Sequence, residues 1–160
     1  QRRPARARAA LGRPLRWSRP LVRARMVDAK ACPQILELSQ HSLNHTVYDT
    51  KWVPSSARFV ALGSYPRATG CLQVFELDGR EATVVKEKEH KSSFKCGTFG
   101  ASSLQTRHLA TGDFGGYLHL WDLQRTEAPI WESKAHATIV NAVDGCGGGN
   151  KGDGAPELAA

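Results

Sequence analysis

The sequence predicts an all-β protein built from repeated units of four short strands. Two observations support this expectation. From about residue 45 onward, apolar and polar residues alternate in short runs separated by glycine-rich turns, which is the pattern of half-buried strands. In addition, the run Tyr117–Leu123 repeats an earlier run, Cys71–Leu77, at an offset of 46 residues. A period of this size indicates stacked units that bury their apolar faces against one another.

The two runs match position by position, and residues around them repeat at the same offset. The most informative match is Phe75 with Trp121. Because side chains alternate between the two faces of a strand, Leu72 and Val74 are expected on one face, and Phe75 and Leu77 on the other. Further positions that recur every 46 residues are Asn44, His90 and His136, Tyr48 and Phe94, and Val53 and Phe99.

The second unit can be divided into strands along its whole length. We expect strands at 92–98, 108–111, 118–123 and 130–134, with a turn at 112–116. Four short strands per unit and a period in the forties are typical of a β-propeller, so about two and a half blades are predicted. The expected organisation is an Arg-rich segment at 1–25, a lead-in segment at 26–43, a degenerate blade at 44–89, a blade at 90–135, and a partial third blade at 136–160.

The partial third unit is expected to begin with a further copy at 138–144. It then continues through a flexible, glycine-rich loop at 145–154 into 155–158.

Within the second unit, His90 is followed 31 residues later by Trp121-Asp122, with Leu-Ala-Thr-Gly at 109–112 between them. This arrangement resembles a WD repeat. The resemblance implies a hydrogen-bonded set of a His, a Ser or Thr, a Trp and a turn Asp inside each blade. Gly115 holds the position of the turn Asp, so the set is expected to be incomplete. The residues at WD-type structural positions are His90, Thr111, Trp121, Asp122 and His136.

Four strings, in order along residues 27–160, resemble the WD-repeat factors that assist axonemal dynein assembly. They are 49–54, 95–100, 110–116 and 154–157. The resemblance implies a cytoplasmic, non-enzymatic adaptor with a seven-bladed propeller and no cofactor, and also a link to apoptosis. The implied partners are a prefoldin-like chaperone module with RuvB-like ATPases, and axonemal dynein heavy chains. The match is to the amino-terminal part of such factors. Because roughly three or more units are needed for stability and only two are complete, we expect a truncated chain that does not fold stably alone.

The positive charge of the chain lies in its first 25 residues. Nine Arg and no acidic residue occur there, whereas residues 26–160 hold 13 basic and 15 acidic residues. A uniformly basic nucleic-acid-binding fold is therefore excluded. We expect residues 1–25 to be disordered. They are upstream sequence preceding a start at Met26, a transit peptide, or a basic arm. A basic arm gives the alternative function, a nucleic-acid-binding protein that releases counterions on binding.

Cysteine spacing and hydropathy exclude several further classes of protein. Cys32, Cys71, Cys96 and Cys146 form no CxxC pair, and residues 1–25 lack the apolar core of a secretory signal. We therefore expect reduced, buried thiols. No run of apolar residues reaches the roughly 18 that a membrane-spanning helix needs, so no membrane partner is predicted.

No group of residues in the sequence predicts catalysis or metal binding. Asp113-Phe114-Gly115 matches a kinase metal-binding triplet, but the other kinase motifs are missing and a turn is expected. The glycine-rich segment 145–154 lacks the Gly-Lys-Ser/Thr of a phosphate loop. His41 and His45 have a metal-compatible spacing only in a helix. The tryptophans expected in the blade core are Trp52, Trp121 and Trp131.

Overall fold

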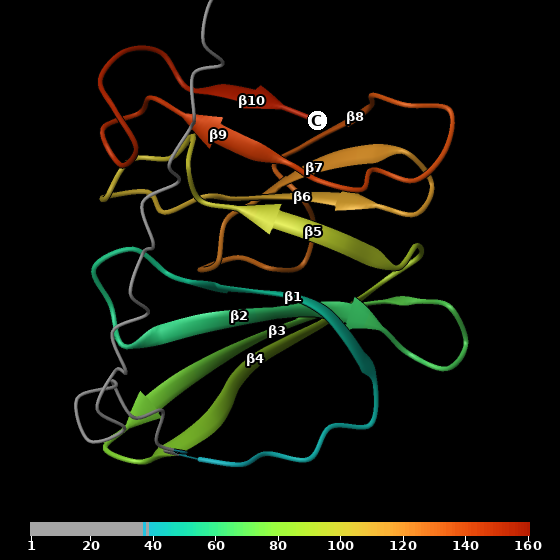
Figure 1. The fold of residues 1–160 in the computed structure, drawn as a ribbon, viewed down its shortest axis with the longest axis vertical. Coiled ribbons are helices and arrows are strands. Elements are labelled where there is room, and N and C mark those ends of the chain that lie inside the picture. The colour runs from blue at the N-terminus through green and yellow to red at the C-terminus, as the bar shows by residue number, and fades with distance from the viewer. Residues whose placement is uncertain (1–36, 38) are drawn as a thin grey trace, which may run out of the picture. The chain divides into compact units, whose positions relative to one another are not determined.

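All regular secondary structure in the described part of the chain is β-strand, which confirms the predicted all-β class (Figure 1). The computed structural model describes residue 37 and residues 39–160. The Arg-rich segment 1–25 and Cys32 lie outside the described residues, as do the expectations attached to them. The described residues contain no helix with the length and apolarity that a bilayer crossing requires.

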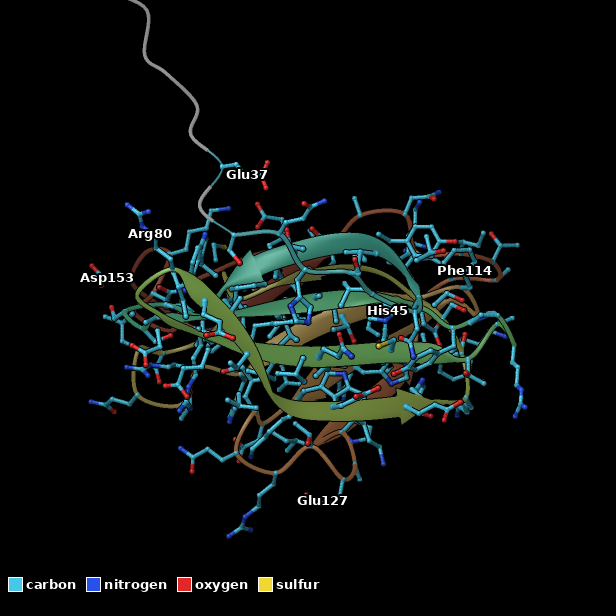
Figure 2. The ribbon with its side chains drawn as sticks, turned by 90° about the horizontal axis from the view of Figure 1, so that it is seen from below. Glu37, His45, Arg80, Phe114, Glu127 and Asp153 are labelled. Atoms are coloured by element: carbon cyan, nitrogen blue, oxygen red, sulfur yellow. The ribbon has the colours of Figure 1, made fainter. Side chains whose placement is uncertain are left out.

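The first sheet consists of four antiparallel strands in the order of the sequence. They are β1 (Thr46–Trp52), β2 (Arg58–Ser64), β3 (Gly70–Asp78) and β4 (Glu81–His90). Gly79, in the turn between β3 and β4, has a φ of +60°, a conformation that glycine adopts without a steric penalty. Figure 2 shows the β3–β4 turn at Arg80 and the β6–β7 turn at Phe114 at opposite ends of the strands.

The second sheet repeats this topology. Its strands are β5 (Phe94–Thr98), β6 (Leu109–Asp113), β7 (Tyr117–Trp121) and β8 (Trp131–Lys134), again antiparallel and in sequence order. Each of the four predicted strands of this unit is present, with its ends within two residues of the expected positions. Successive four-stranded antiparallel sheets are the blades of a β-propeller.

The two sheets share one apolar core, in which β1 and β2 of the first sheet face β5 of the second. Leu62 is fully buried, and a Cβ placed on Gly97 would lie 2.5 Å from Leu62 Cδ1. Glycine at position 97 therefore lets the two sheets approach each other. Asp49 on β1 adds a polar link, because its Oδ2 accepts a hydrogen bond of 2.9 Å from the Gly97 amide. The buried members of this core are Val53, Val60, Leu62, Leu72, Val74, Phe94, Phe99, Leu109 and Trp121.

The two faces of β3 divide as the alternation predicted. Leu72 and Val74 lie in the core shared with the second sheet. Phe75 and Leu77 lie on the opposite face, where the Phe75 and Phe59 rings stack with centroids 4.9 Å apart. Burying one such large apolar side chain contributes about 1.5–3 kcal/mol. Each face of the first sheet thus has its own apolar cluster.

The third unit differs from its prediction. Its strand pair is β9 (Asp144–Cys146) with β10 (Glu157–Ala159), so the first strand begins later than the copy at 138–144 indicates. Val140 instead continues the contacts of the second sheet, because its amide donates to the Asp113 carbonyl at 3.0 Å. Gly145, expected in a loop, lies in β9, where an added Cβ would be 2.7 Å from the Ala101 amide nitrogen.

Two predictions about burial are wrong in part. Trp121 is fully buried, but Trp52 is 60% exposed and Trp131 is 48% exposed. These two residues lie at strand ends, the last residue of β1 and the first of β8. Among the described cysteines, Cys71 and Cys96 are buried free thiols, as expected. Cys146 is a free thiol but is exposed, because the alternation of β9 turns Gly145 rather than Cys146 inward.

Candidate functional site: the polar network of the second sheet

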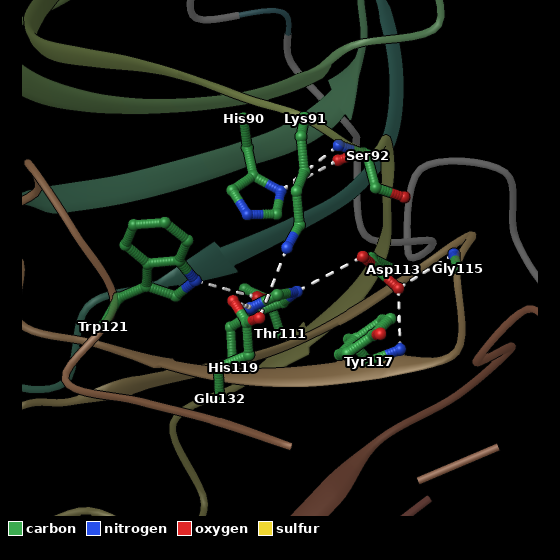
Figure 3. Close-up of polar contacts among 10 residues, drawn as sticks. All are labelled: His90, Lys91, Ser92, Thr111, Asp113, Gly115, Tyr117, His119, Trp121 and Glu132. Atoms are coloured by element: carbon green, nitrogen blue, oxygen red, sulfur yellow. Dashed lines mark hydrogen bonds and ion pairs between the residues drawn. The ribbon is translucent and has the colours of Figure 1, made fainter. Parts of the chain in front are cut away.

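A buried hydrogen bond joins the tryptophan and the threonine that the sequence analysis selected. Trp121 Nε1 donates to Thr111 Oγ1 at 2.9 Å, and both side chains are fully buried (Figure 3). The two residues come together because β6 and β7 pair antiparallel with Leu109 opposite Trp121. A buried donor without a partner costs about 1–3 kcal/mol. The indole therefore favours the orientation in which its N–H keeps this bond.

His90, the last residue of the first sheet, packs against this pair. Its ring meets the Trp121 ring edge-on, with centroids 5.8 Å apart, and stacks on Phe94 at 5.1 Å. Its Nδ1 lies 3.2 Å from the Ser92 carbonyl oxygen. Burial lowers the pKa of His90 below its ordinary value, since desolvation disfavours the imidazolium. The structure therefore brings three of the five selected residues together.

Asp113 supplies the turn carboxylate that the sequence analysis expected to be missing. The side chain is fully buried at the end of β6. Its Oδ1 accepts hydrogen bonds from the Gly115 amide at 2.9 Å and the Tyr117 amide at 2.8 Å. An aspartate that caps the amides two and four residues ahead holds the β6–β7 turn closed. The turn carboxylate thus comes from a residue two positions before Gly115, while the hydrogen bonds of His90 run to Ser92.

His119 lies between two carboxylates and has no exposed side-chain surface. Its Nε2 is 3.3 Å from Asp113 Oδ2, and its Nδ1 is 3.3 Å from Glu132 Oε2. Glu132 is 35% exposed, and its Oε1 is 3.3 Å from the Lys91 ammonium. The strand register produces this row, since β6, β7 and β8 place Thr111, His119 and Glu132 opposite one another.

The sequence analysis did not select Asp113, His119 or Glu132. The available signals were an Asp followed by Gly two residues later, which favours a local turn, and a His at a strand position paired with Thr111. Neither signal indicates which face of the strand is buried. The register of three neighbouring strands was needed to place these side chains together.

The other two selected residues, Asp122 and His136, do not join the network. Asp122 lies in the turn after β7, where its Oδ1 accepts a hydrogen bond of 2.8 Å from the Gln124 amide. His136 is exposed, and its amide donates to the Gly116 carbonyl at 3.0 Å. His41 and His45 do not lie in a helix, and His45 Nδ1 contacts the Asn44 side-chain oxygen at 3.1 Å.

The fold and the network together define the class of this chain. Two successive four-stranded sheets that share a core, with a strand-three tryptophan bonded to a strand-two threonine, are blades of a WD-repeat β-propeller. No protein-family model matches the chain.

Comparison with curated proteins links the chain to dynein axonemal assembly factors. It is 60% identical over 133 residues to dynein axonemal assembly factor 10 of Chlamydomonas reinhardtii, a match that covers 83% of this chain and 37% of that protein. The protein of that name from Danio rerio is 52% identical over 126 residues, covering 79% of this chain and 35% of that protein. The Homo sapiens protein is 50% identical with the same coverage. The chain spans about a third of the length of these relatives.

A solved structure with a similar arrangement is a chain of "Crystal Structure of Mitotic Checkpoint Complex". It has a TM-score of 0.49 and 14% sequence identity, and the match covers 64% of this chain and 28% of that chain.

Proposed function

We propose that this chain works as part of a non-enzymatic WD-repeat scaffold in the assembly of axonemal dynein. The observation that carries the proposal is the 60% identity over 133 residues to a protein named as a dynein axonemal assembly factor. Identity at this level over most of the described residues favours a shared role. The cytoplasmic location and the link to apoptosis remain predictions.

The burial of the network supports a scaffold rather than an enzyme. The side chains of Thr111, Asp113, His119 and Trp121 are fully buried, so substrate cannot reach their polar atoms from the surface. A polar set of this kind stabilises the blade and fixes the turns at its ends. We therefore infer that Thr111 and Trp121 serve the fold rather than a reaction.

Partner binding would use the surfaces that remain open. The loops at the two ends of the strands are the usual place for recognition on a rigid β scaffold. Exposed aromatic side chains, among them Trp52 and Trp131, add side chains of the type that is enriched at protein interfaces. The proposed partners are axonemal dynein heavy chains and a prefoldin-like chaperone module with RuvB-like ATPases.

Affinity purification from ciliated cells tests this proposal. The tagged chain is expected to retain dynein heavy chains or the chaperone module, as measured by quantitative mass spectrometry. A Trp52→Ser, Trp131→Ser double variant is the matched control, since it changes the surface and leaves the buried network intact. A folded chain that captures neither partner above the level of an unrelated propeller contradicts the proposal.

The nucleic-acid alternative depends on residues 1–25, which lie outside the described residues. Its test is the salt dependence of RNA and DNA binding with and without this segment. Binding that is absent at low salt removes the alternative.

A further inference from the structure

Three potential metal ligands converge beside the buried network. One ligating atom from each of His90, His119 and Glu132 lies within 4.8 Å of the others. The three residues come from β4, β7 and β8, so the group joins the two sheets (Figure 3). Within the described part of the chain, these are the three His, Cys, Asp or Glu side chains whose ligating atoms come this close together.

His119 presents a free lone pair to this group. Its Nε2 faces the Asp113 carboxylate at 3.3 Å, an arrangement that places the ring proton on Nε2. Nδ1 is then an acceptor, and it faces another acceptor, Glu132 Oε2, at 3.3 Å. Nδ1 is buried and has no hydrogen-bond partner among the described residues. A donor or a cation must lie between two acceptors that face each other at this distance, and either a proton or a metal ion would meet that need.

His90 is oriented in the same way by its own neighbour. Its Nδ1 lies 3.2 Å from the Ser92 carbonyl oxygen and 3.4 Å from the Ser92 amide nitrogen. In one tautomer the Ser92 amide donates to Nδ1, and in the other Nδ1–H donates to the Ser92 carbonyl. In the second tautomer Nε2 keeps its lone pair and can bind a metal. Histidines that bind a metal usually donate their second N–H to a carboxylate or a backbone carbonyl. Asp113 and Ser92 provide one such acceptor for each ring.

We propose that His90, His119 and Glu132 bind a zinc ion, with Asp113 and the Ser92 carbonyl as positioning groups. Two imidazoles and one carboxylate are a ligand set that zinc accepts, with the fourth position left to water. The ion supplies the positive charge that His119 Nδ1 and Glu132 lack between them.

The Lys91 ammonium competes with a metal ion for the Glu132 carboxylate. The ammonium lies 3.3 Å from Glu132 Oε1, and the side chain of Lys91 is 64% exposed, so it can turn into solvent when an ion binds. Removing the ammonium frees the carboxylate. Lys91→Gln is therefore expected to tighten zinc binding, an effect opposite to that of a ligand substitution.

The test is zinc titration of the full 160-residue chain, read by competition with a chromophoric chelator. A Cys32→Ser, Cys146→Ser background removes the exposed thiol of Cys146 and the thiol of Cys32, which lies outside the described residues. One equivalent of zinc is expected to bind and to raise the unfolding temperature. Glu132→Gln is the main variant because its side chain is part-exposed, and it is expected to weaken binding at least about tenfold, as is Asp113→Asn. His136→Gln is the matched control and is expected to leave binding unchanged.

Three results would overturn the proposal. The first is a chain that binds no zinc in this competition. The second is binding that Glu132→Gln leaves unchanged. The third is a His119 ring that stays protonated on both nitrogens at pH 7 in the presence of zinc, seen by ¹⁵N NMR. In that case the cluster is an ion pair between an imidazolium and two carboxylates.

Discussion

The hydrogen bond between Trp121 and Thr111 gives the sharpest quantitative prediction. Thr111→Val replaces the hydroxyl with a methyl group of nearly the same size, so packing around the fully buried site is preserved. The change removes the acceptor of the 2.9 Å bond and leaves the indole N–H buried without a partner. An unsatisfied buried donor costs about 1–3 kcal/mol. The free energy of unfolding of the variant is expected to fall by that amount.

The assay is urea unfolding at 25 °C, followed by tryptophan fluorescence and far-UV circular dichroism together. Thr83→Val is the matched control, since Thr83 is an exposed threonine on β4, and its free energy of unfolding is expected to change by less than about 0.5 kcal/mol. Coincident transitions by the two probes are required before the free energies are compared.

A double-mutant cycle separates the hydrogen bond from packing. Trp121→Phe alone removes the donor and opens space in the core shared by the two sheets. In the double variant with Thr111→Val no polar group is left unpaired, so its cost is expected to be about 1 kcal/mol less than the sum of the single costs. Strict additivity, or a Thr111→Val variant as stable as the parent chain, would refute the reasoning.

Three further predictions concern the same region. Gly112→Ala places a methyl group 2.5 Å from Val140 Cγ1, so it is expected to lower the free energy of unfolding in urea by about 1–3 kcal/mol. Gly115→Ala, whose added methyl group has its nearest neighbour at 3.4 Å, is expected to lower it much less. Leu62→Ala empties a fully buried site between the sheets and is expected to cost about 2–5 kcal/mol; a loss under 1 kcal/mol would place Leu62 outside the core. Because the pKa of His90 is lowered in the folded state, the unfolded state takes up the proton first as the pH falls. With EDTA present, the free energy of unfolding is therefore expected to decrease below pH 6.5, and His90→Gln is expected to make this decrease smaller.

Periodicity was sufficient to predict the strands of the second unit. Alternation along Tyr117–Leu123 predicts a strand, and the 46-residue offset marks the same strand in the first unit. The Thr111 and Trp121 pair could be chosen because a WD-type spacing fixes both residues on neighbouring strands. These features depend on local sequence, and the structure reproduces them.

Features that depend on register or on neighbouring elements could not be predicted. His119 becomes part of the network only because β7 pairs with β6 and β8 in a register that aligns it with Thr111 and Glu132. The exposure of Trp52 could not be predicted, because alternation predicts two faces for a strand but does not indicate what covers each face. The first strand of the third unit is displaced because Val140 bonds to the end of the second sheet instead.

The packing of the two sheets as neighbouring blades is tested most directly by a NOESY spectrum of methyl-labelled protein. Leu62 Cδ1 lies 2.5 Å from the position that a Cβ on Gly97 would take, so a strong NOE is expected between the Leu62 methyl protons and the Gly97 α protons. The cross-strand NOEs within each sheet serve as the internal reference. A spectrum that shows those reference NOEs but no Leu62–Gly97 contact would contradict the shared core.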